Sequence, residues 1–239
     1  MSALRSAAWS AVGFVVVYAL AVRTAAGQHL DESAMNWLAG ALGSHRWAEL
    51  LLHLVSETSV LLLAGALVAA AALFRGGRVA LCTAMTVGSV VVAAQVLKWT
   101  LIRPSLLTEA IANSFPSGHV AAVAGLGAAL VVALPSRLRG LAVGALLPLV
   151  GLTGLATVVL AWHRPSDVAG SVLLAVTVAS LAIALSERWT SAARPRQGSG
   201  SRQDAEPRTI EASAASIQRQ PANSSGESAA PTPIRSPRR

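Results

Sequence analysis

Residues 58–74 read TSVLLLAGALVAAAALF and contain no charged side chain. With its flanking residues, this stretch is long enough to cross a hydrocarbon core of about 30 Å as a helix that rises about 1.5 Å per residue. Similar stretches recur from Ala7 to Leu185, and they are continuously apolar, which is typical of membrane helices and not of barrel strands. The sequence therefore predicts an all-α, polytopic membrane helix bundle with about six transmembrane helices. The expected spans are residues 7–26, 50–74, 79–98, 118–134, 141–162 and 168–186.

The composition supports a membrane protein and argues against a nucleic-acid partner. The chain is 54% hydrophobic and 13% charged, whereas soluble domains average about 25% charged residues. The net charge of +8 comes mostly from the C-terminal region and from short loops between spans, where positive charge sets topology. Cys82 is the only cysteine, which excludes an intramolecular disulfide and a thiolate metal site.

Three regions follow from this pattern. Residues 1–49 hold the first span and an external interfacial helix over 27–49, where Trp37 and Trp47 have the character of interface residues. Residues 50–186 hold the other five spans. Residues 187–239 are rich in Ser, Pro, Arg and Gln and poor in large apolar residues, which predicts a disordered basic cytoplasmic tail.

The first span has an alternative interpretation as a secretory signal peptide. Arg5, the apolar run and the small residues Ala19 and Ala21 fit that pattern. The length of the run favours a retained span, and so does Arg23, which interrupts the region where cleavage would fall. The later spans do not depend on the choice.

Arginines at the span ends predict the orientation. Six spans place one set of arginine-containing loops, together with both termini, on the same side of the membrane. By the positive-inside rule this side is the cytoplasm. The arginines concerned are Arg5, Arg75, Arg78, Arg137, Arg139, Arg188, Arg194 and Arg196.

A second set of ionisable residues lies at the opposite span ends and predicts an active site at the outer face. Ionisable side chains at such depths are costly and usually functional. Helix ends bring residues that are distant in sequence to one membrane face. The set consists of Lys98, Arg103, His119, His163, Arg164 and Asp167.

The residue types in this set fit phosphate chemistry. Ser117 is a suitable N-cap for a helix that begins near Gly118, and the free N–H groups of a helix start bind anions. Lys98 and Arg103 add positive charge for a phosphate, although cations at span ends also serve as snorkelling anchors. Asp167 follows His163 by four residues, so a carboxylate can fix the imidazole tautomer and leave the other nitrogen free to attack.

Three segments resemble the motifs of the type 2 phosphatidic acid phosphatases, a family related to vanadium haloperoxidases. They are KWTLIRP at 98–104, PSGH at 116–119 and HRPSD at 163–167. The resemblance covers about residues 50–186 and implies a membrane-bound lipid phosphatase.

The resemblance also implies a role for each site residue. His163 would attack phosphorus and form a phosphohistidine, Asp167 would orient it, and His119 would protonate the leaving alcohol. No metal and no cofactor would be needed. The phosphate would be held by Lys98, Arg103, Ser117 and the backbone N–H groups near Gly118.

The motifs depart from the family pattern in two places. Four residues separate Lys98 from Arg103, where the family usually has six. Ala156 and Thr157 stand where the family has Ser-Arg, so one phosphate-binding arginine is missing. Arg164 is the nearest replacement, although a helical segment would turn it about 100° away from His163.

Three further polar or aromatic residues lie near the predicted site. For Glu57, an ion pair with Lys98 or an arginine is favoured over catalysis. Trp99 and Trp162 are interpreted as interface anchors, with contact to a lipid chain as the alternative.

The expected function is hydrolysis of a lipid phosphate or isoprenoid diphosphate, with membrane lipid as the surroundings. The alternatives are a phosphotransferase of the same fold and a catalytically weak scaffold or lipid-binding protein. A transporter is disfavoured because the ionisable residues do not lie at the midplane. The sequence carries no signal for the oligomeric state.

The orientation is testable by cysteine labelling in intact cells, in a background without Cys82. An impermeant thiol reagent should modify Thr108→Cys, in the outer loop, and should not modify Arg137→Cys, in a cytoplasmic loop. The reverse labelling pattern would contradict the predicted topology.

Overall fold

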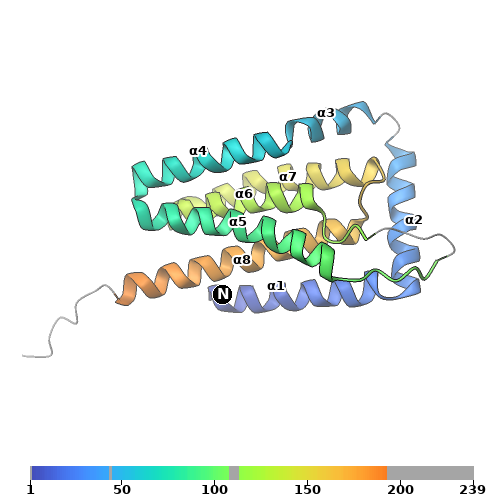
Figure 1. Ribbon diagram of the computed structural model, residues 1–239, viewed down its shortest axis with the longest axis horizontal. Coiled ribbons are helices and arrows are strands. Elements are labelled where there is room, and N and C mark those ends of the chain that lie inside the picture. The colour runs from blue at the N-terminus through green and yellow to red at the C-terminus, as the bar shows by residue number, and fades with distance from the viewer. Residues whose placement is uncertain (1, 43–44, 108–112, 193–239) are drawn as a thin grey trace, which may run out of the picture. The chain divides into compact units, whose positions relative to one another are not determined.

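The computed structural model describes residues 2–42, 45–107 and 113–192, and the regular elements within these ranges are all helical (Figure 1). Helix α1 ends in a π-helical turn, η1, and the other helices follow in chain order. The elements are α1 (Ala3–Val17), η1 (Tyr18–Val22), α2 (Ala25–Ala41), α3 (Arg46–Leu54), α4 (Glu57–Arg75), α5 (Gly77–Thr100), α6 (Gly118–Ala133), α7 (Ser136–Val159) and α8 (Pro165–Ala192).

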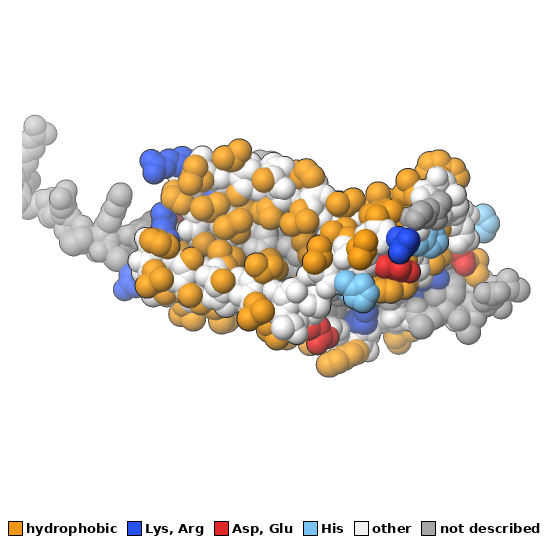
Figure 2. All heavy atoms as spheres, turned by 90° about the horizontal axis from the view of Figure 1, so that it is seen from above, with side chains coloured by type: hydrophobic (Ala, Val, Ile, Leu, Met, Phe, Trp, Pro, Cys, Tyr) orange, Lys and Arg blue, Asp and Glu red, His pale blue; other side chains and the backbone are white. Residues whose placement is uncertain are grey.

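The bundle consists of α1 and α4–α8, which run side by side, and α2 crosses one end of it (Figure 1). Five stretches of the described residues are long and apolar enough to cross a membrane, and α6, at 16 residues, is a shorter apolar helix. On the face shown in Figure 2, the coloured side chains between the two ends of the bundle are mostly hydrophobic. The predicted all-α membrane bundle is thus confirmed, and the chain is a multi-pass membrane protein. The five long stretches are Ala3–Val22, Glu57–Arg75, Gly77–Thr100, Ser136–Val159 and Pro165–Arg188.

The second span begins later than its apolar pattern indicates. Ser56 caps α4, because its side chain accepts a hydrogen bond from the N–H of Ser59 at 3.2 Å. The preceding residues form the separate helix α3, so the single external helix expected over 27–49 is in fact two helices, α2 and α3. Continuous apolar residues on both sides of the cap conceal this break in the sequence.

Helix α6 is the most buried helix and packs against α5, α7 and α8. Small residues make this close packing possible. A Cβ added to Gly125 would lie only 3.2 Å from Val90 of α5. Between membrane helices, such close van der Waals contact replaces the hydrophobic driving force that operates in water. The N-terminus of α6 is therefore held firmly among its neighbours.

The first and last helices pack along each other. The hydroxyl of Thr177 on α8 donates to the hydroxyl oxygen of Ser10 on α1 at 2.9 Å. Pro165 opens α8, a position that suits a residue without an N–H group. Helix α8 continues beyond the expected span end at residue 186 to Ala192, and the rest of the predicted tail lies outside the described residues.

Phe115 joins the loop before α6 to the first and last helices. Its ring is fully buried and packs against Phe14 and Tyr18, at centroid distances of 5.2 and 5.7 Å. Gly170 of α8 lies directly against the same ring, and a Cβ added there would overlap two of its carbon atoms. Phe115 thus fixes the segment that carries Ser117.

Gly170→Ala should therefore lower stability, because overpacking of a fitted interior typically costs about 1–3 kcal/mol. Thermal unfolding of the purified protein in detergent measures the effect. Gly151→Ala on α7 is the matched control: a Cβ there meets nothing within 4 Å, and replacing a helical glycine by alanine gains about 0.5–1 kcal/mol. Equal unfolding midpoints for the two variants would contradict this packing.

Candidate active site

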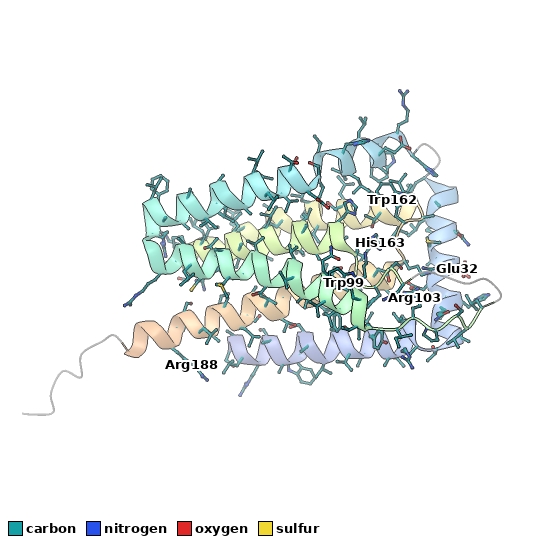
Figure 3. The ribbon with its side chains drawn as sticks, in the orientation of Figure 1. Glu32, Trp99, Arg103, Trp162, His163 and Arg188 are labelled. Atoms are coloured by element: carbon teal, nitrogen blue, oxygen red, sulfur yellow. The ribbon has the colours of Figure 1, made fainter. Side chains whose placement is uncertain are left out.

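The predicted site residues from three separate segments meet at one end of the bundle. Arg103 and His163, with Trp99 and Trp162 nearby, lie at the end crossed by α2, and Arg188 lies at the other end (Figure 3). His119 at the start of α6 is close enough to His163 and Lys98 for electrostatic interaction. The expectation that helix ends gather these residues on one face is met by the geometry.

His163 and Asp167 form a buried pair. Nδ1 of His163 lies 3.4 Å from Oδ2 of Asp167. Asp167 is in the first turn of α8 and accepts the N–H of Arg164 at 2.9 Å, which is one of the two hydrogen bonds of a capping box. This local bond holds the carboxylate beside the imidazole. With Nδ1 directed at Asp167, the Nε2 atom of His163 is the one available for chemistry.

The loop between α7 and α8 is shaped by Thr157. The N–H groups of Trp162 and His163 both donate to the carbonyl oxygen of Thr157, at 3.0 and 3.2 Å. Its hydroxyl donates to Gly154 within α7. Ala161 adopts a φ of 54°, which is uncommon for a residue other than glycine. The residue at the family's arginine position thus has a backbone role in placing His163.

Arg164 lies in this loop and not in a helix, because α8 begins only at Pro165. The helical segment on which the expected 100° turn depends is therefore absent at Arg164. The side chain is buried, and its Nη1 atom lies 3.4 Å from the hydroxyl of Ser114. Its Nε atom has no hydrogen-bond partner among the described residues.

Arg103 forms a buried ion pair with Asp167. Its Nη2 atom donates to Oδ1 of Asp167 at 2.9 Å, and neither side chain is exposed. Burial lowers the pKa of the Arg103 guanidinium, and the charge of Asp167 opposes that change. The Nε and Nη1 atoms of Arg103 have no hydrogen-bond partner within the described part of the chain. Arg103, predicted as a phosphate ligand, thus has one nitrogen committed to Asp167 and two donors still unpaired.

The start of α6 has the features of an anion site. Ser117 is the N-cap, as expected, and its hydroxyl oxygen accepts from the N–H of Val120. Across the described residues, the N–H groups of Gly118 and His119 have no hydrogen-bond partner. A Cβ added to Gly118 would meet nothing within 4 Å. Free N–H groups at a helix start can bind a phosphate.

His119 is half-buried, and its ring centroid lies 5.8 Å from that of Trp162. Glu57 at the start of α4 interacts electrostatically with His119. The ion pair predicted for Glu57 with Lys98 or an arginine is wrong as far as the structure describes the chain, because Glu57 takes part in none of the ion pairs found there.

Three residues that contribute to the site lie outside the three motifs. Ser114 donates to Oδ2 of Asp167 at 2.6 Å. Asn113 donates to the carbonyl oxygens of Lys98 and Leu101, and so secures the end of α5. Asp31 of α2 accepts two hydrogen bonds from Ser166.

Of these three residues, only Asp31 lies in a periodic pattern that the sequence shows. It shares one helical face with Gln28 and Met35, and all three are buried. No group of three or more His, Cys, Asp or Glu side chains suited to a metal ion occurs in the described ranges.

Comparison with known proteins identifies the family. The PAP2 superfamily model matches residues 77–191, the part of the chain that carries all the predicted catalytic residues. The structure is similar to that described as the first transmembrane PAP2 type phosphatidylglycerolphosphate phosphatase from Bacillus subtilis. The TM-score is 0.63 and the sequence identity 23%, over 77% of this chain and 96% of that one. No curated protein sequence matches the chain.

Residues 77–191 therefore form a PAP2 superfamily domain, and the chain shares the fold of the solved transmembrane protein of that superfamily. The resemblance found in the three motifs is confirmed. Together, the family and the fold support a membrane lipid phosphatase as the general class.

The buried ion pair predicts a specific stability pattern. Asp167→Asn removes the nearer of the two carboxylates around Arg103 and leaves only Asp31 at 4.0 Å, and breaking a buried pair typically costs about 3–5 kcal/mol. Adding Arg103→Met removes the stranded charge, so the double variant should unfold at a higher temperature than Asp167→Asn alone. Thermal unfolding in detergent compares the wild type, Asp167→Asn and the double variant.

The exposed Arg46 provides the control, because Arg46→Gln should change stability by no more than about 0.5 kcal/mol. If the double variant is less stable than Asp167→Asn, an unpaired Arg103 charge is not the reason that Asp167→Asn is destabilised.

Proposed function

We propose that the protein hydrolyses a lipid phosphate or isoprenoid diphosphate through a phosphohistidine on His163. The observation that carries this proposal is the buried His163–Asp167 pair, which lies beside His119 and beside two arginines with unpaired donors. An imidazole oriented by a carboxylate is a nucleophile, and buried unpaired N–H donors favour an anion.

Binding of the phosphoryl group would use the fixed donors around the histidines. The free N–H groups at Gly118 and His119 and the unpaired donors of Arg103 suit the phosphoryl oxygens. Lys98 adds a point charge, and Ser117 holds the start of α6 in place. Such transfer depends mainly on positioning and charge stabilisation.

The reaction would proceed in two displacements. Nε2 of His163 forms a bond to phosphorus as the bond to the leaving oxygen breaks, and His119 gives that oxygen a proton. Water then attacks the phosphohistidine and gives its proton to His119, so inorganic phosphate leaves and both histidines return to their initial states. Asp167 holds Nδ1–H of His163 and stabilises the positive charge that develops on the ring. No step is assigned to a metal or to a cofactor.

Arg164 is proposed to replace the arginine absent at Thr157. It is buried beside His163, its Nη1 atom is near Ser114, and its Nε atom is unpaired among the described residues. A planar guanidinium in this position suits the oxygens of a phosphate better than an ammonium would.

The substrate would approach from the membrane at the extracytoplasmic side, with both termini in the cytoplasm. The arginine distribution supports this orientation. Trp99 and Trp162 are 80% and 52% exposed at the site end of the bundle, where aromatic residues fit a membrane interface. The solved neighbour is described as a phosphatidylglycerolphosphate phosphatase, which places phospholipid monoesters among the substrates to test.

A catalytically weak lipid-binding protein is the second candidate. It is favoured by the engagement of Arg103 with Asp167 and by Thr157 at the family's arginine position. A phosphotransferase would share the first displacement and differ only in the acceptor, with an alcohol in place of water.

Phosphate release by the purified protein tests the proposal. The wild type, His163→Ala and His119→Ala are assayed in EDTA against a panel of lipid phosphates and diphosphates, and against nitrophenyl phosphate. His163→Ala should abolish turnover of every substrate and any phosphoenzyme. His119→Ala should lose far more activity on lipid, at least about 10²-fold, than on the nitrophenyl ester, whose leaving group needs no proton.

Each outcome decides between the candidates. Equal losses on both substrates would contradict the role of His119 as the acid. Turnover retained in His163→Ala would contradict the phosphohistidine mechanism, and wild-type protein that binds lipid phosphates without releasing phosphate would favour the second candidate.

A further inference from the structure

Asp31 is a buried acid on α2 that lies outside the three motifs. Only 7% of the residue is exposed. Its Oδ1 atom accepts the N–H of Ser166 at 2.9 Å, and its Oδ2 atom accepts the hydroxyl of the same residue. Burial raises the pKa of the Asp31 carboxyl, and the two hydrogen bonds from Ser166 oppose that rise. Through these bonds the crossing helix α2 is attached to the start of α8.

The point of attachment adjoins the catalytic pair. Ser166 is the second residue of α8, and the N–H groups of a first helical turn have no partner within the helix. A carboxylate at this position satisfies one such group and interacts favourably with the helix dipole. The next residue is Asp167, so Asp31 holds the backbone that carries the partner of His163.

Arg103 provides a second link between the two carboxylates. Its Nη2 atom lies 2.9 Å from Oδ1 of Asp167 and 4.0 Å from Oδ2 of Asp31. One guanidinium nitrogen is thus shared, unequally, by two buried acids. Without the charge of Asp31, Arg103 would be drawn to Asp167 alone, and the 3.4 Å contact between Asp167 and His163 would weaken.

We propose that Asp31 is a positioning residue for phosphoryl transfer, which keeps Asp167 aligned on His163 by holding Ser166 and by sharing Arg103. This inference rests on His163 as the nucleophile of the proposed function. Asp31 acts through Asp167 and Arg103 and does not contact the reacting atoms, so its removal should reduce turnover more than substrate binding.

Glu32 offers a matched control on the same helix. It is an acid next to Asp31 in sequence, it is partly exposed, and its side chain forms no hydrogen bond or ion pair with any other described residue. Its side chain lies at the crossing helix in Figure 3, where Arg103 is also labelled. Neutralising Glu32 removes the same charge from α2 without touching Ser166 or Arg103.

The test compares kcat and KM of Asp31→Asn, Ser166→Ala and Glu32→Gln in the full chain, on the lipid phosphate that the wild type hydrolyses best. Asp31→Asn should lower kcat by about 10-fold, the size of effect seen when outer partners are removed at metal sites, and should change KM less than kcat. Ser166→Ala should lower kcat less, and Glu32→Gln should match the wild type. A merely structural role would reduce the yield of monodisperse protein and leave kcat per folded molecule intact.

Reactivity of His163 supplies a measure that does not require turnover. Diethyl pyrocarbonate at alkaline pH modifies neutral imidazole, and peptide mass spectrometry reports each histidine separately. His163 should be modified several-fold more slowly in Asp31→Asn than in Glu32→Gln, with His119 as the internal reference.

The two measurements separate the possible failures. If the wild type shows no turnover but Asp31→Asn still slows the modification of His163, the proposed hydrolysis is overturned and the positioning role is supported. If the wild type is active and Asp31→Asn matches Glu32→Gln in both measurements, only the positioning role is overturned. If Asp31→Asn does not fold, Ser166→Ala decides by the same two measurements.

Discussion

The ion pair between Arg103 and Asp167 is the interaction on which the arrangement of the site depends. A fully buried carboxylate is unfavourable unless its oxygens are satisfied. Asp167 contacts donors from three segments: Arg103 after α5, Ser114 before α6, and the N–H of Arg164 before α8. The same carboxylate then lies beside His163. One desolvated charge thus joins the loops that carry all three motifs, and His163 takes its place from that junction.

The membrane bundle provides the rigidity that this junction needs. Helix α6 is surrounded by other helices, and small residues at its contacts allow the backbones to approach closely. Its free N-terminal N–H groups are therefore held in a fixed position next to the histidines. Phe115, packed between the first and last helices, fixes the loop that leads into α6. The groups proposed to bind phosphate are set in place before any ligand arrives, as electrostatic catalysis requires.

The charges of the site are more nearly balanced than a simple phosphate-binding cluster would be. Arg103 and Arg164 lie close to the carboxylates Asp31 and Asp167. Each arginine keeps donors without a partner in the described part of the chain. An incoming phosphate would therefore add charge to a network that already has two acids, with Lys98 as the additional cation nearby. This balance explains how two arginines remain buried at the end of a membrane bundle, and it gives Asp31 a defined electrostatic position.

The sequence alone determined the helical membrane class, most of the spans and the residues of the three motifs, because apolar length and motif spacing are local properties. It also placed Ser117 at the start of α6, since an N-cap is a local preference. Only the tertiary structure decided that Arg103 pairs with Asp167, that Arg164 lies in a loop beside His163, and that Asp31 reaches α8 across 135 residues. Those contacts arise where separate helix ends converge, and no periodicity within one segment encodes which buried charges will meet.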